Sequence, residues 1–581
     1  MNAEEIRTRI LASVAQNGGH LASSLGAVEL AQALAETFDP EKDRIVWDVG
    51  HQAYAWKILT GRADRFGTLR QMGGISGFPN PAESRADAAV AGHAGVALSV
   101  AEGFAAARDL RGSDEHVVAV IGDSSFVNGT CFEALNNCTS SCRKVIVVLN
   151  DNEMSISKPT GAFSRYLGRL IAGRGYNRVK ETVKRVSRAL RIYEPAHRIK
   201  AFFKRMLLGR VYFEEMGLRY IGPVNGHDLK ALKAALAVAR ADDRSVLLHV
   251  VTKKGKGFPP AEENPTAWHG VGPFVLDSNT PTPTTPSTPN TPPPAPAPAW
   301  SDVFGAALCE LAASDTRIVA LTAGMKDGTG LAGFAERFPR RFHDVGIAEG
   351  HMVAFAAGLA AGGSRPVVAV YSTFLQRAVD QVMHDVCISN LPVVFCVDRA
   401  GVVGADGVTH QGIYDLAMLR CLPNLTICQP KDAEDLRQLL AEALDRPGPT
   451  LIRYPRGKAP TPNTPTPSTP NTSPLRLAIW ATGDWYEKAQ AVAARVPGAV
   501  AVHARCLKPF DARLLADQRA RGMKIVSLEN GSVAGGLGEA IGADLKFGWP
   551  DVFIPHGTPD ELERRYGLDV DALVKAINDE L

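Results

Sequence analysis

The clearest pattern of hydrophobic and polar positions lies between residues 116 and 157. Val117 to Ile121 is an unbroken run of β-branched and apolar residues, which is typical of a strand buried on both faces of a parallel sheet. A turn of small residues follows, then a helix from about Gly129 to Asn137 and a second buried strand from Lys144 to Leu149. Strand, helix and strand in this order predict a βαβ unit.

The same alternation of helical and strand-like patterns recurs along most of the chain. It fills three segments, 1–278, 300–458 and 475–581, which predict an α/β fold of three domains with mainly parallel sheets. The stretches 279–299 and 459–474 consist almost entirely of Pro, Thr, Ser, Asn and Ala. Proline at this density removes hydrogen-bond donors and favours extended chain, so both stretches are predicted to be linkers.

Composition and charge exclude several classes of function. The 581 residues carry a net charge of only +3, which gives no reason to expect nucleic acid as a partner. No run of apolar residues is long enough to span a bilayer, and the first 16 residues form an amphipathic helical pattern rather than a signal peptide. The nine cysteines include no CxxC pair, so we expect neither a disulfide framework nor a metal cluster. A cytoplasmic enzyme without a membrane partner is the resulting expectation.

A strongly basic stretch between residues 164 and 210 is the one local exception to this balance of charge. Its apolar residues recur every three or four positions, which predicts a helix. The charge would suit an RNA or an anionic lipid surface. The simpler interpretation is a solvated helical excursion, and both interpretations stay open.

Polar residues follow both strands of the βαβ unit described first. Asp123 comes after the first strand and Asn152 after the second, and 152 − 123 = 29 residues is the length of about one such unit. Ligands of open parallel sheets bind beyond the carboxyl ends of the strands, so we expect the two side chains to emerge side by side. A carboxylate and an amide oxygen suit a hard cation that also holds phosphate oxygens. The alternative is that both side chains only cap helices and turns.

The segment resembles the diphosphate-binding motif of thiamine-diphosphate enzymes, which opens with Gly-Asp-Gly and closes with Asn one βαβ unit later. The resemblance implies that Asp123, Asn152 and the main-chain carbonyl of Met154 hold Mg²⁺. One residue departs from the motif, because Ser124 stands where the motif has its second glycine.

Longer strings extend this resemblance over nearly the whole chain outside the linkers. GGHLASSLGAVEL, WDVGHQAYAWKILTGR, YIGPVNGHD, TKKGKGF, YSTFLQRAVDQVMHDV and DRAGVVGADGVTHQG are similar to strings of the 1-deoxy-D-xylulose-5-phosphate synthase family. The resemblance implies a homodimer with two thiamine-diphosphate-binding domains and a C-terminal transketolase-like domain. The implied reaction is the decarboxylation of pyruvate and the joining of its remaining carbons to D-glyceraldehyde 3-phosphate. Its product, 1-deoxy-D-xylulose 5-phosphate, feeds isoprenoid, thiamine and pyridoxal synthesis in that family.

The resemblance also assigns roles to individual residues. Glu349 would hydrogen-bond the aminopyrimidine ring of the cofactor, and Phe374 would stack on that ring. Proton transfer has four candidates, His20, His51, His269 and His410. The implied contacts to the rest of the cofactor are made by His51, Gly92, His93, Ala94, Ser124, Ser125, Asn152 and Phe258. The phosphorylated aldehyde would be bound by Tyr371, Arg377, Arg399, Asp406, His410 and Arg456.

The chain departs from the family at several of these places, which keeps other functions open. The residues Ala94 to Ala97 replace Ser-Ser-Thr-Ser, Phe258 and Val379 replace tyrosines, and Gly350 replaces a glutamine. One alternative is another transketolase-like transferase, and a second is a paralogue that binds the cofactor with little turnover. A third is an interaction protein that acts through the basic stretch.

Overall fold

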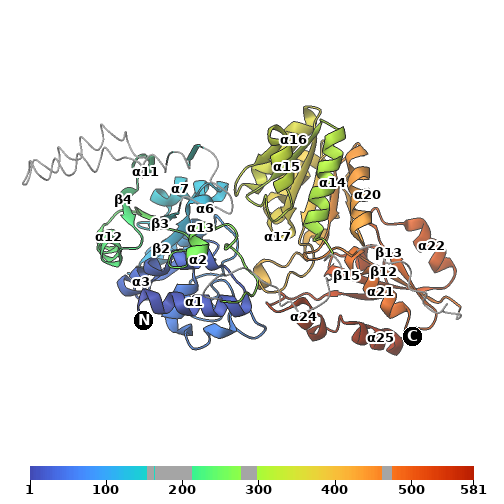
Figure 1. Cartoon of the computed structure of the whole chain (residues 1–581), viewed down its shortest axis with the longest axis horizontal. Coiled ribbons are helices and arrows are strands. Elements are labelled where there is room, and N and C mark those ends of the chain that lie inside the picture. The colour runs from blue at the N-terminus through green and yellow to red at the C-terminus, as the bar shows by residue number, and fades with distance from the viewer. Residues whose placement is uncertain (153–161, 164–165, 167–211, 277–296, 461–473, 581) are drawn as a thin grey trace, which may run out of the picture. The chain divides into compact units, whose positions relative to one another are not determined.

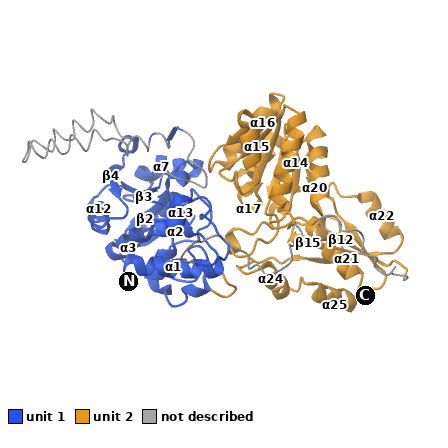
Figure 2. Cartoon of the chain, viewed as in Figure 1, with its two compact units in different colours: residues 1–69, 75–285 blue, residues 70–74, 286–581 orange. Residues whose placement is uncertain are grey.

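The computed structural model describes residues 1–152, 162–163, 166, 212–276, 297–460 and 474–580. Met154, nearly all of the basic stretch and most of both predicted linkers lie outside these residues. The chain forms two compact units, which are shown in Figure 2. Unit 1 comprises Met1–Leu69 and Ile75–Thr285, and unit 2 comprises Arg70–Gly74 and Pro286–Leu581. The domain boundaries at the two linkers stay a prediction.

Unit 1 is built on a five-stranded sheet, of which β2, β3 and β4 are labelled in Figure 1. The strand order is β1-β2-β3-β5-β4, and each neighbouring pair is parallel. The strands are β1 (Arg44–Trp47), β2 (Val117–Gly122), β3 (Ile146–Asp151), β4 (Arg219–Asn225) and β5 (Val246–Val251). The described α-helices of this unit are α1 (Ala3–Asn17), α2 (Leu21–Gly26), α3 (Val28–Thr37), α4 (Tyr54–Lys57), α5 (Ala97–Arg111), α6 (Asp123–Phe126), α7 (Gly129–Ser141), α11 (Tyr212–Glu215), α12 (Leu229–Ala241) and α13 (Pro259–Glu263).

Both faces of this sheet are covered, which explains the unbroken apolar run in β2. Val118 and Val120 belong to a core that includes residues of α1 to α4 and α12. Val117, Ala119 and Ile121 point to the opposite face, into a core with residues of α5 and α7. Successive side chains of a strand alternate between faces, so a strand buried on both sides needs apolar residues at every position.

Unit 2 contains two sheets. The larger has the order β14-β10-β11-β9-β8-β6-β7, in which only the edge pair β14–β10 is antiparallel among the described strands. The smaller is parallel, with the order β13-β12-β15-β16. The strands are β6 (Ile318–Thr322), β7 (Phe342–Asp344), β8 (Arg365–Tyr371), β9 (Val394–Asp398), β10 (Thr426–Cys428), β11 (Thr450–Arg453), β12 (Leu477–Ala481), β13 (Ala499–His503), β14 (Cys506–Lys508), β15 (Lys524–Ser532) and β16 (Leu545–Trp549).

Helices flank both sheets of unit 2. Alternate residues of β8 enter two different cores, Val368 and Val370 one of them and Val367 and Ala369 the other, so the larger sheet is also buried on both faces. The described α-helices are α14 (Trp300–Ser314), α15 (Ala332–Arg337), α16 (Glu349–Ala361), α17 (Ser372–Leu375), α18 (Val379–Gln381), α19 (Asp415–Leu419), α20 (Ala433–Asp445), α21 (Tyr486–Ala493), α22 (Ala512–Ala520), α23 (Leu537–Ala540), α24 (Pro559–Arg565) and α25 (Val570–Asp579).

The predicted fold class, α/β with mainly parallel sheets, is confirmed, and the element boundaries differ by a few residues. Strand β2 ends one residue later than predicted, and β3 runs from Ile146 to Asp151 rather than from Lys144 to Leu149. Lys144 instead lies before the strand, where its Nζ donates a hydrogen bond to the carbonyl oxygen of Arg240 at 2.7 Å. The predicted turn after β2 is the short helix α6, and α7 continues to Ser141.

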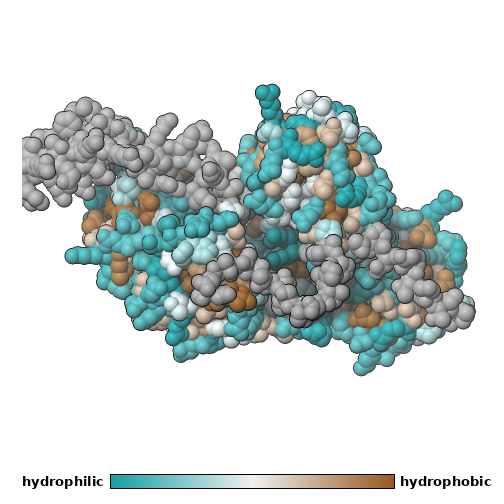
Figure 3. Space-filling model, in the orientation of Figure 1, coloured by the Kyte–Doolittle hydropathy of each residue, from teal (hydrophilic) through white to brown (hydrophobic). Residues whose placement is uncertain are grey.

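On the face shown in Figure 3, hydrophilic residues predominate and hydrophobic residues form small, separate patches. Among the described residues, no helix combines the length and the apolar character that crossing a bilayer requires.

Candidate active site

The carboxyl ends of β2 and β3 meet at one edge of the sheet in unit 1. The two strands are parallel neighbours with Gly122 paired to Asn150, Asp123 begins α6, and Asn152 directly follows β3. Asp123 is only 7% exposed. Its burial, together with the negative charge of Asp151, raises the pKa of the Asp123 carboxyl to about 7. The structure therefore places Asp123 and Asn152 at the same edge, as the spacing predicts.

The donors at this edge fit a cation and its phosphate ligands. A buried carboxylate costs free energy unless a cation or hydrogen-bond donors compensate it, and a bound cation would do so for Asp123. The hydroxyl of Ser124 is buried and has no hydrogen-bond partner among the described residues, and Ser125 is buried beside it. The described residues contain no group of three or more His, Cys, Asp or Glu that could hold a metal by themselves. The third predicted ligand, Met154, lies outside them.

Lys254 is a further buried charge near Asp123, and no sequence motif predicts its burial. It lies in the string TKKGKGF, where the pattern alone does not distinguish a buried lysine from its exposed neighbours. Burial lowers the pKa of Lys254 to about 8, and the charge of Asp123 opposes this shift. The positive charge of Lys254 also contributes to lowering the pKa values of His51 and His269.

Three predicted histidines of unit 1 form a cluster. The ring centroids lie 6.1 Å apart for His20 and His51, 5.8 Å for His20 and His269, and 5.4 Å for His51 and His269. Burial, and then the neighbouring cationic groups, lower the pKa values of His51 and His269 well below the ordinary value. Both rings are therefore neutral at pH 7, and each has one nitrogen that can accept a proton. The Nδ1 atom of His269 lies 3.3 Å from the hydroxyl oxygen of Ser23.

A strained turn carries His51 to this cluster. Val49 has φ 58° and Gly50 has φ 84°, and the left-handed region is unfavourable for a β-branched residue such as valine. A Cβ atom on Gly50 would lie 2.3 Å from Cδ of Pro79, so only glycine fits there. Strain of this kind persists where the surroundings hold the backbone, and it is frequent at functional sites.

The loop before α5 carries three more predicted contacts. Gly92 is buried, and His93 and Ala94 are half-buried. Behind them, the backbone N–H groups of residues 95, 96 and 97 donate to the carboxylate of Asp48 at 2.9, 3.1 and 3.1 Å. The loop is therefore held through its backbone and not through the hydroxyl groups that the family has at these positions.

Phe258 keeps an aromatic ring at a position where the family has tyrosine. It precedes α13 and packs edge to face against Trp268, with ring centroids 5.2 Å apart. Trp268 directly precedes His269 in the chain. Phenylalanine in place of tyrosine keeps the aromatic ring and removes only the hydroxyl group.

In unit 2, Glu349 is the first residue of α16 and is only 4% exposed. Its Oε2 atom is buried and has no hydrogen-bond partner among the described residues. Burial raises the pKa of the Glu349 carboxyl, and the positive charge of Arg377 opposes this shift in part. A buried carboxyl without a partner is costly, and such groups are frequent at functional sites.

The two family departures near Glu349 have simple packing explanations. A Cβ atom on Gly350 would lie 3.1 Å from Oε1 of Gln381, so the Gln381 side chain occupies the space next to this glycine. Val379 is half-buried and packs against the hydrophobic core beneath it. Neither Gly350 nor Val379 has a side-chain group that could form a hydrogen bond with the Glu349 carboxyl.

Aromatic rings follow β8 in the same unit. Tyr371 and Phe374 have ring centroids 5.8 Å apart, and Phe374 and His410 have centroids 5.7 Å apart. The hydroxyl of Thr373 donates to the carbonyl oxygen of Thr409 at 2.9 Å, which fastens the loop of His410 to α17. The structure thus brings Phe374, Tyr371 and His410 together.

The predicted phosphate ligands lie at the ends of three adjacent strands. Strands β8, β9 and β11 are neighbours in the sheet. Tyr371 is the last residue of β8, Arg399 directly follows β9, and Arg456 lies shortly after the end of β11. The guanidinium of Arg399 lies 3.8 Å above the ring of Tyr371. Desolvation by the surrounding protein lowers the pKa of Arg456, and the positive charge of Arg399 lowers it further. The Arg456 side chain nevertheless keeps solvent access. Two arginines that repel one another in this way favour a bound anion.

Two other arginines of unit 2 form ion pairs with aspartates. Arg453 belongs to the same RYPRG string as Arg456, yet it is fully buried and forms an ion pair with Asp415 at 3.0 Å. Arg70 was not predicted, and its Nη2 atom lies 2.7 Å from Oδ1 of Asp406. Arg70 holds the predicted phosphate-binding residue Asp406 within unit 2 although 336 positions separate them.

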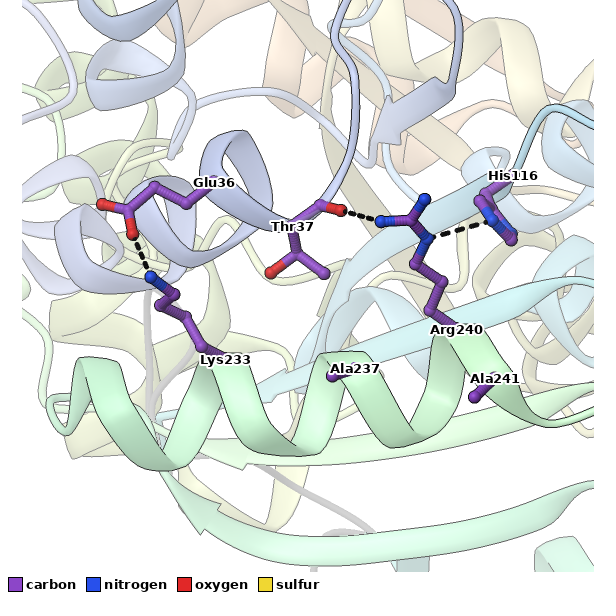
Figure 4. A pocket seen from close by; sticks show the side chains of 7 residues that line it. All are labelled: Glu36, Thr37, His116, Lys233, Ala237, Arg240 and Ala241. Carbon is purple, nitrogen blue, oxygen red and sulfur yellow. Dashed lines mark hydrogen bonds and ion pairs between the residues drawn. The ribbon is translucent and has the colours of Figure 1, made fainter.

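Unit 1 also has a pocket of about 460 Å³ (Figure 4). It is lined by residues of α3 and α12 and by His116, which precedes the amino end of β2. Its basic groups already have partners, since Lys233 pairs with Glu36 at 2.5 Å and Arg240 donates to His116 Nε2 at 3.2 Å. Asp123 lies at the opposite, carboxyl end of β2, and the pocket contains none of the predicted site residues that the structure describes.

Comparison with known proteins gives the family. Residues 1–252 match the family model described as 1-deoxy-D-xylulose-5-phosphate synthase, and residues 296–462 match the transketolase pyrimidine binding domain. The 1-deoxy-D-xylulose-5-phosphate synthase of Oleidesulfovibrio alaskensis is 45% identical over 609 residues, covering 99% of this chain and 94% of that protein. Those of Desulforudis audaxviator and Aquifex aeolicus are each 45% identical over 607 residues, covering 100% of this chain and 94% and 95% of the relatives. The chain therefore belongs to the 1-deoxy-D-xylulose-5-phosphate synthase family.

Proposed function

We propose that this protein is a transferase that converts pyruvate and D-glyceraldehyde 3-phosphate into 1-deoxy-D-xylulose 5-phosphate and carbon dioxide. Membership of the family supports this activity. The observation that carries it within the site is Glu349, a buried carboxyl whose Oε2 atom has no partner among the described residues. We also propose Mg²⁺ as a cofactor, a homodimeric state and a cytoplasmic location.

The residues of unit 1 would hold the diphosphate end of thiamine diphosphate. When bound, this cofactor supplies a carbanion at its thiazolium ring, which no side chain can provide. Asp123 and Asn152 would bind Mg²⁺ together with the carbonyl of Met154, and Mg²⁺ prefers such oxygen ligands. Ser124, Ser125 and the loop of Gly92, His93 and Ala94 would contact the phosphate groups and the ring next to them.

The histidine cluster would serve proton transfer in the same unit. His51 and His269 are neutral at pH 7 because their pKa values are lowered, so each can accept a proton from a substrate group. His20 completes the cluster, and Phe258 would pack beside it. Half-buried rings close together also limit the access of water to the groups that react.

The residues of unit 2 would hold the pyrimidine end and the phosphorylated substrate. The Glu349 carboxyl would share a proton with a ring nitrogen of the pyrimidine, and Phe374 would stack on that ring. Arg399 and Arg456 would bind the phosphate group of the aldehyde, with Tyr371, Arg377 and Asp406 around it. His410, which packs on Phe374, would help to bind the phosphorylated aldehyde and is the fourth candidate for proton transfer.

The experiment that tests this function measures product formation from pyruvate and D-glyceraldehyde 3-phosphate, with and without thiamine diphosphate and Mg²⁺. We expect a five-carbon deoxyketose phosphate that depends on both additions. Ketose phosphates offered as donors in place of pyruvate test for a transketolase instead. Bound cofactor without any product would contradict the synthase assignment and favour a paralogue with little turnover.

We predict that Arg456→Ala raises the KM for D-glyceraldehyde 3-phosphate by about tenfold or more, because hydrogen bonds to charged groups contribute about 1.5–3 kcal/mol. The KM for pyruvate, which has no phosphate, should stay within about twofold. Steady-state kinetics with each substrate varied separately measures both values. Arg437→Ala is the matched control, since Arg437 pairs with Glu310 on the surface at 3.1 Å. An equal rise in both KM values would argue against a phosphate-binding role.

A further inference from the structure

The backbone N–H groups of the loop before α5 depend on a hydrogen-bond acceptor from outside the loop. Helix α5 begins at Ala97 and, within the described residues, its N-cap Val96 provides no capping side chain. The family resemblance places hydroxyl residues at positions 95 to 97, and hydroxyl groups are effective caps. Here Gly95, Val96 and Ala97 have none, so the first backbone N–H groups of the helix need another acceptor.

Asp48 is that acceptor. It directly follows β1, is 1% exposed, and lies 47 positions before Gly95 in the chain. One carboxylate oxygen accepts from Gly95 N at 2.9 Å, and the other accepts from Val96 N and Ala97 N at 3.1 Å each. A carboxylate with three N–H donors is well compensated despite its burial, and these charge-assisted bonds are stronger than neutral ones.

The same aspartate stands at the start of the turn that carries His51. Asp48 is followed by Val49 and Gly50, the two residues in the left-handed conformation, and its carbonyl oxygen accepts from Gly50 N at 2.5 Å. One residue therefore joins the turn of His51, through its backbone, to the loop of Gly92 and His93, through its side chain.

Asn128 closes the loop from the other side. Gly95 has φ 82°, and a Cβ atom there would lie 2.5 Å from both Cγ and Oδ1 of Asn128. Asn128 is itself buried, and its Oδ1 atom accepts from Thr130 N at 3.1 Å as the cap of α7. The backbone at Gly95 thus fits between Asp48 and Asn128 without room for a side chain.

We propose that Asp48 is the positioning residue of the cofactor site, which holds the backbone of residues 95–97 and thereby places Gly92 and His93 beside the turn of His51. This inference rests on the proposed function, because it takes these residues to be cofactor contacts. It also gives the N–H groups of residues 95–97 an acceptor without any hydroxyl group at these positions. Backbone N–H groups are offered by alanine, glycine and valine as well as by serine.

The test uses the full-length protein and Asp48→Asn, with two readouts. The asparagine keeps one acceptor oxygen but turns an NH₂ group toward N–H donors, so the three bonds cannot all persist. We expect the amides of residues 95–97 to exchange hydrogen at least about tenfold faster in the cofactor-free variant. We also expect the affinity for thiamine diphosphate, measured by calorimetry with Mg²⁺, to fall by about tenfold or more.

Asp432→Asn is the matched control. Asp432 is also a buried aspartate that caps a helix, since its Oδ1 atom accepts from Asp435 N at 2.9 Å at the start of α20 in unit 2. This variant should lose stability without losing cofactor affinity. Unchanged exchange or unchanged affinity in Asp48→Asn would overturn the positioning role alone. Failure of the wild-type protein to bind thiamine diphosphate would instead overturn the proposed function, and with it this role.

A second pair of variants examines the fit at Gly95. Restoring the family's serine in Gly95→Ser should weaken cofactor binding instead of improving it, because the new Cβ collides with Asn128. Gly95→Ser combined with Asn128→Ala should recover part of the affinity, and the positive φ prevents full recovery. Tighter binding by Gly95→Ser alone would contradict the proposed packing of the loop.

Discussion

Glu349→Gln should lower turnover by about a hundredfold or more, because a positioned acid–base group contributes a factor of this size. The glutamine keeps the shape of the side chain but cannot share a proton with the pyrimidine ring. Steady-state kinetics at saturating thiamine diphosphate and Mg²⁺ measures the loss. Glu434→Gln is the control, since Glu434 occupies the first turn of α20 in an exposed position. Turnover near that of the wild type would remove Glu349 from the mechanism.

The same variant should not lose stability. Burial raises the pKa of Glu349 in the folded protein, so the folded state binds this proton more tightly than the unfolded state does. The carboxyl therefore costs stability once the pH exceeds its ordinary value of 4.5, and the cost grows until the pH passes the raised pKa. A neutral glutamine avoids this cost. We expect a Tm of the cofactor-free variant at or above that of the wild type at pH 8, with the difference shrinking toward pH 5. A clearly lower Tm would indicate that Glu349 has a structural role.

Asp123→Asn should reduce the Mg²⁺-dependent affinity for thiamine diphosphate by about a hundredfold or more. Changes to residues that only support metal ligands cost about 10- to 100-fold in metal affinity, and loss of a ligand itself should reach at least the upper end. Calorimetric titrations with Mg²⁺ and with a chelator separate the metal-dependent part of the affinity from the rest.

Asp114→Asn is the control for this variant, because Asp114 is an exposed aspartate of unit 1 that pairs with Lys42 at 2.8 Å. It should leave the affinity unchanged. An Asp123→Asn protein that binds the cofactor as tightly as the wild type, and equally well with the chelator, would show that the metal is held elsewhere.

Much of the candidate site was open to prediction because its residues follow strands. Asp123, Asn152 and Arg399 each follow an apolar run, where parallel sheets collect their ligands. Tyr371 was assigned through the family resemblance. The histidine cluster was reachable only through the family resemblance, since nothing in the spacing of His20, His51 and His269 requires that they meet.

Other residues of the site gave no local signal. Lys254 is one of three lysines in TKKGKGF, and its burial depends on how that loop packs against α2. Arg453 and Arg456 look alike in the sequence, yet one is buried against Asp415 and the other keeps solvent access. A short string defines the type of side chain but not the neighbour that will pair with it.

The sequence by itself determined the α/β class, the two-sided burial of β2, and the placement of Asp123 and Asn152 at the same edge of the sheet. All three follow from the period of side chains along a strand and from the direction of parallel strands, which are local properties. Tertiary structure decided that the run AVAVHARCLKPFD divides into β13 and β14, which join different sheets. It also decided that Arg70 pairs with Asp406 and that Asp48 holds the backbone of residues 95–97. These pairings join residues 47 to 336 positions apart, and they form only once packing has brought the surrounding elements together.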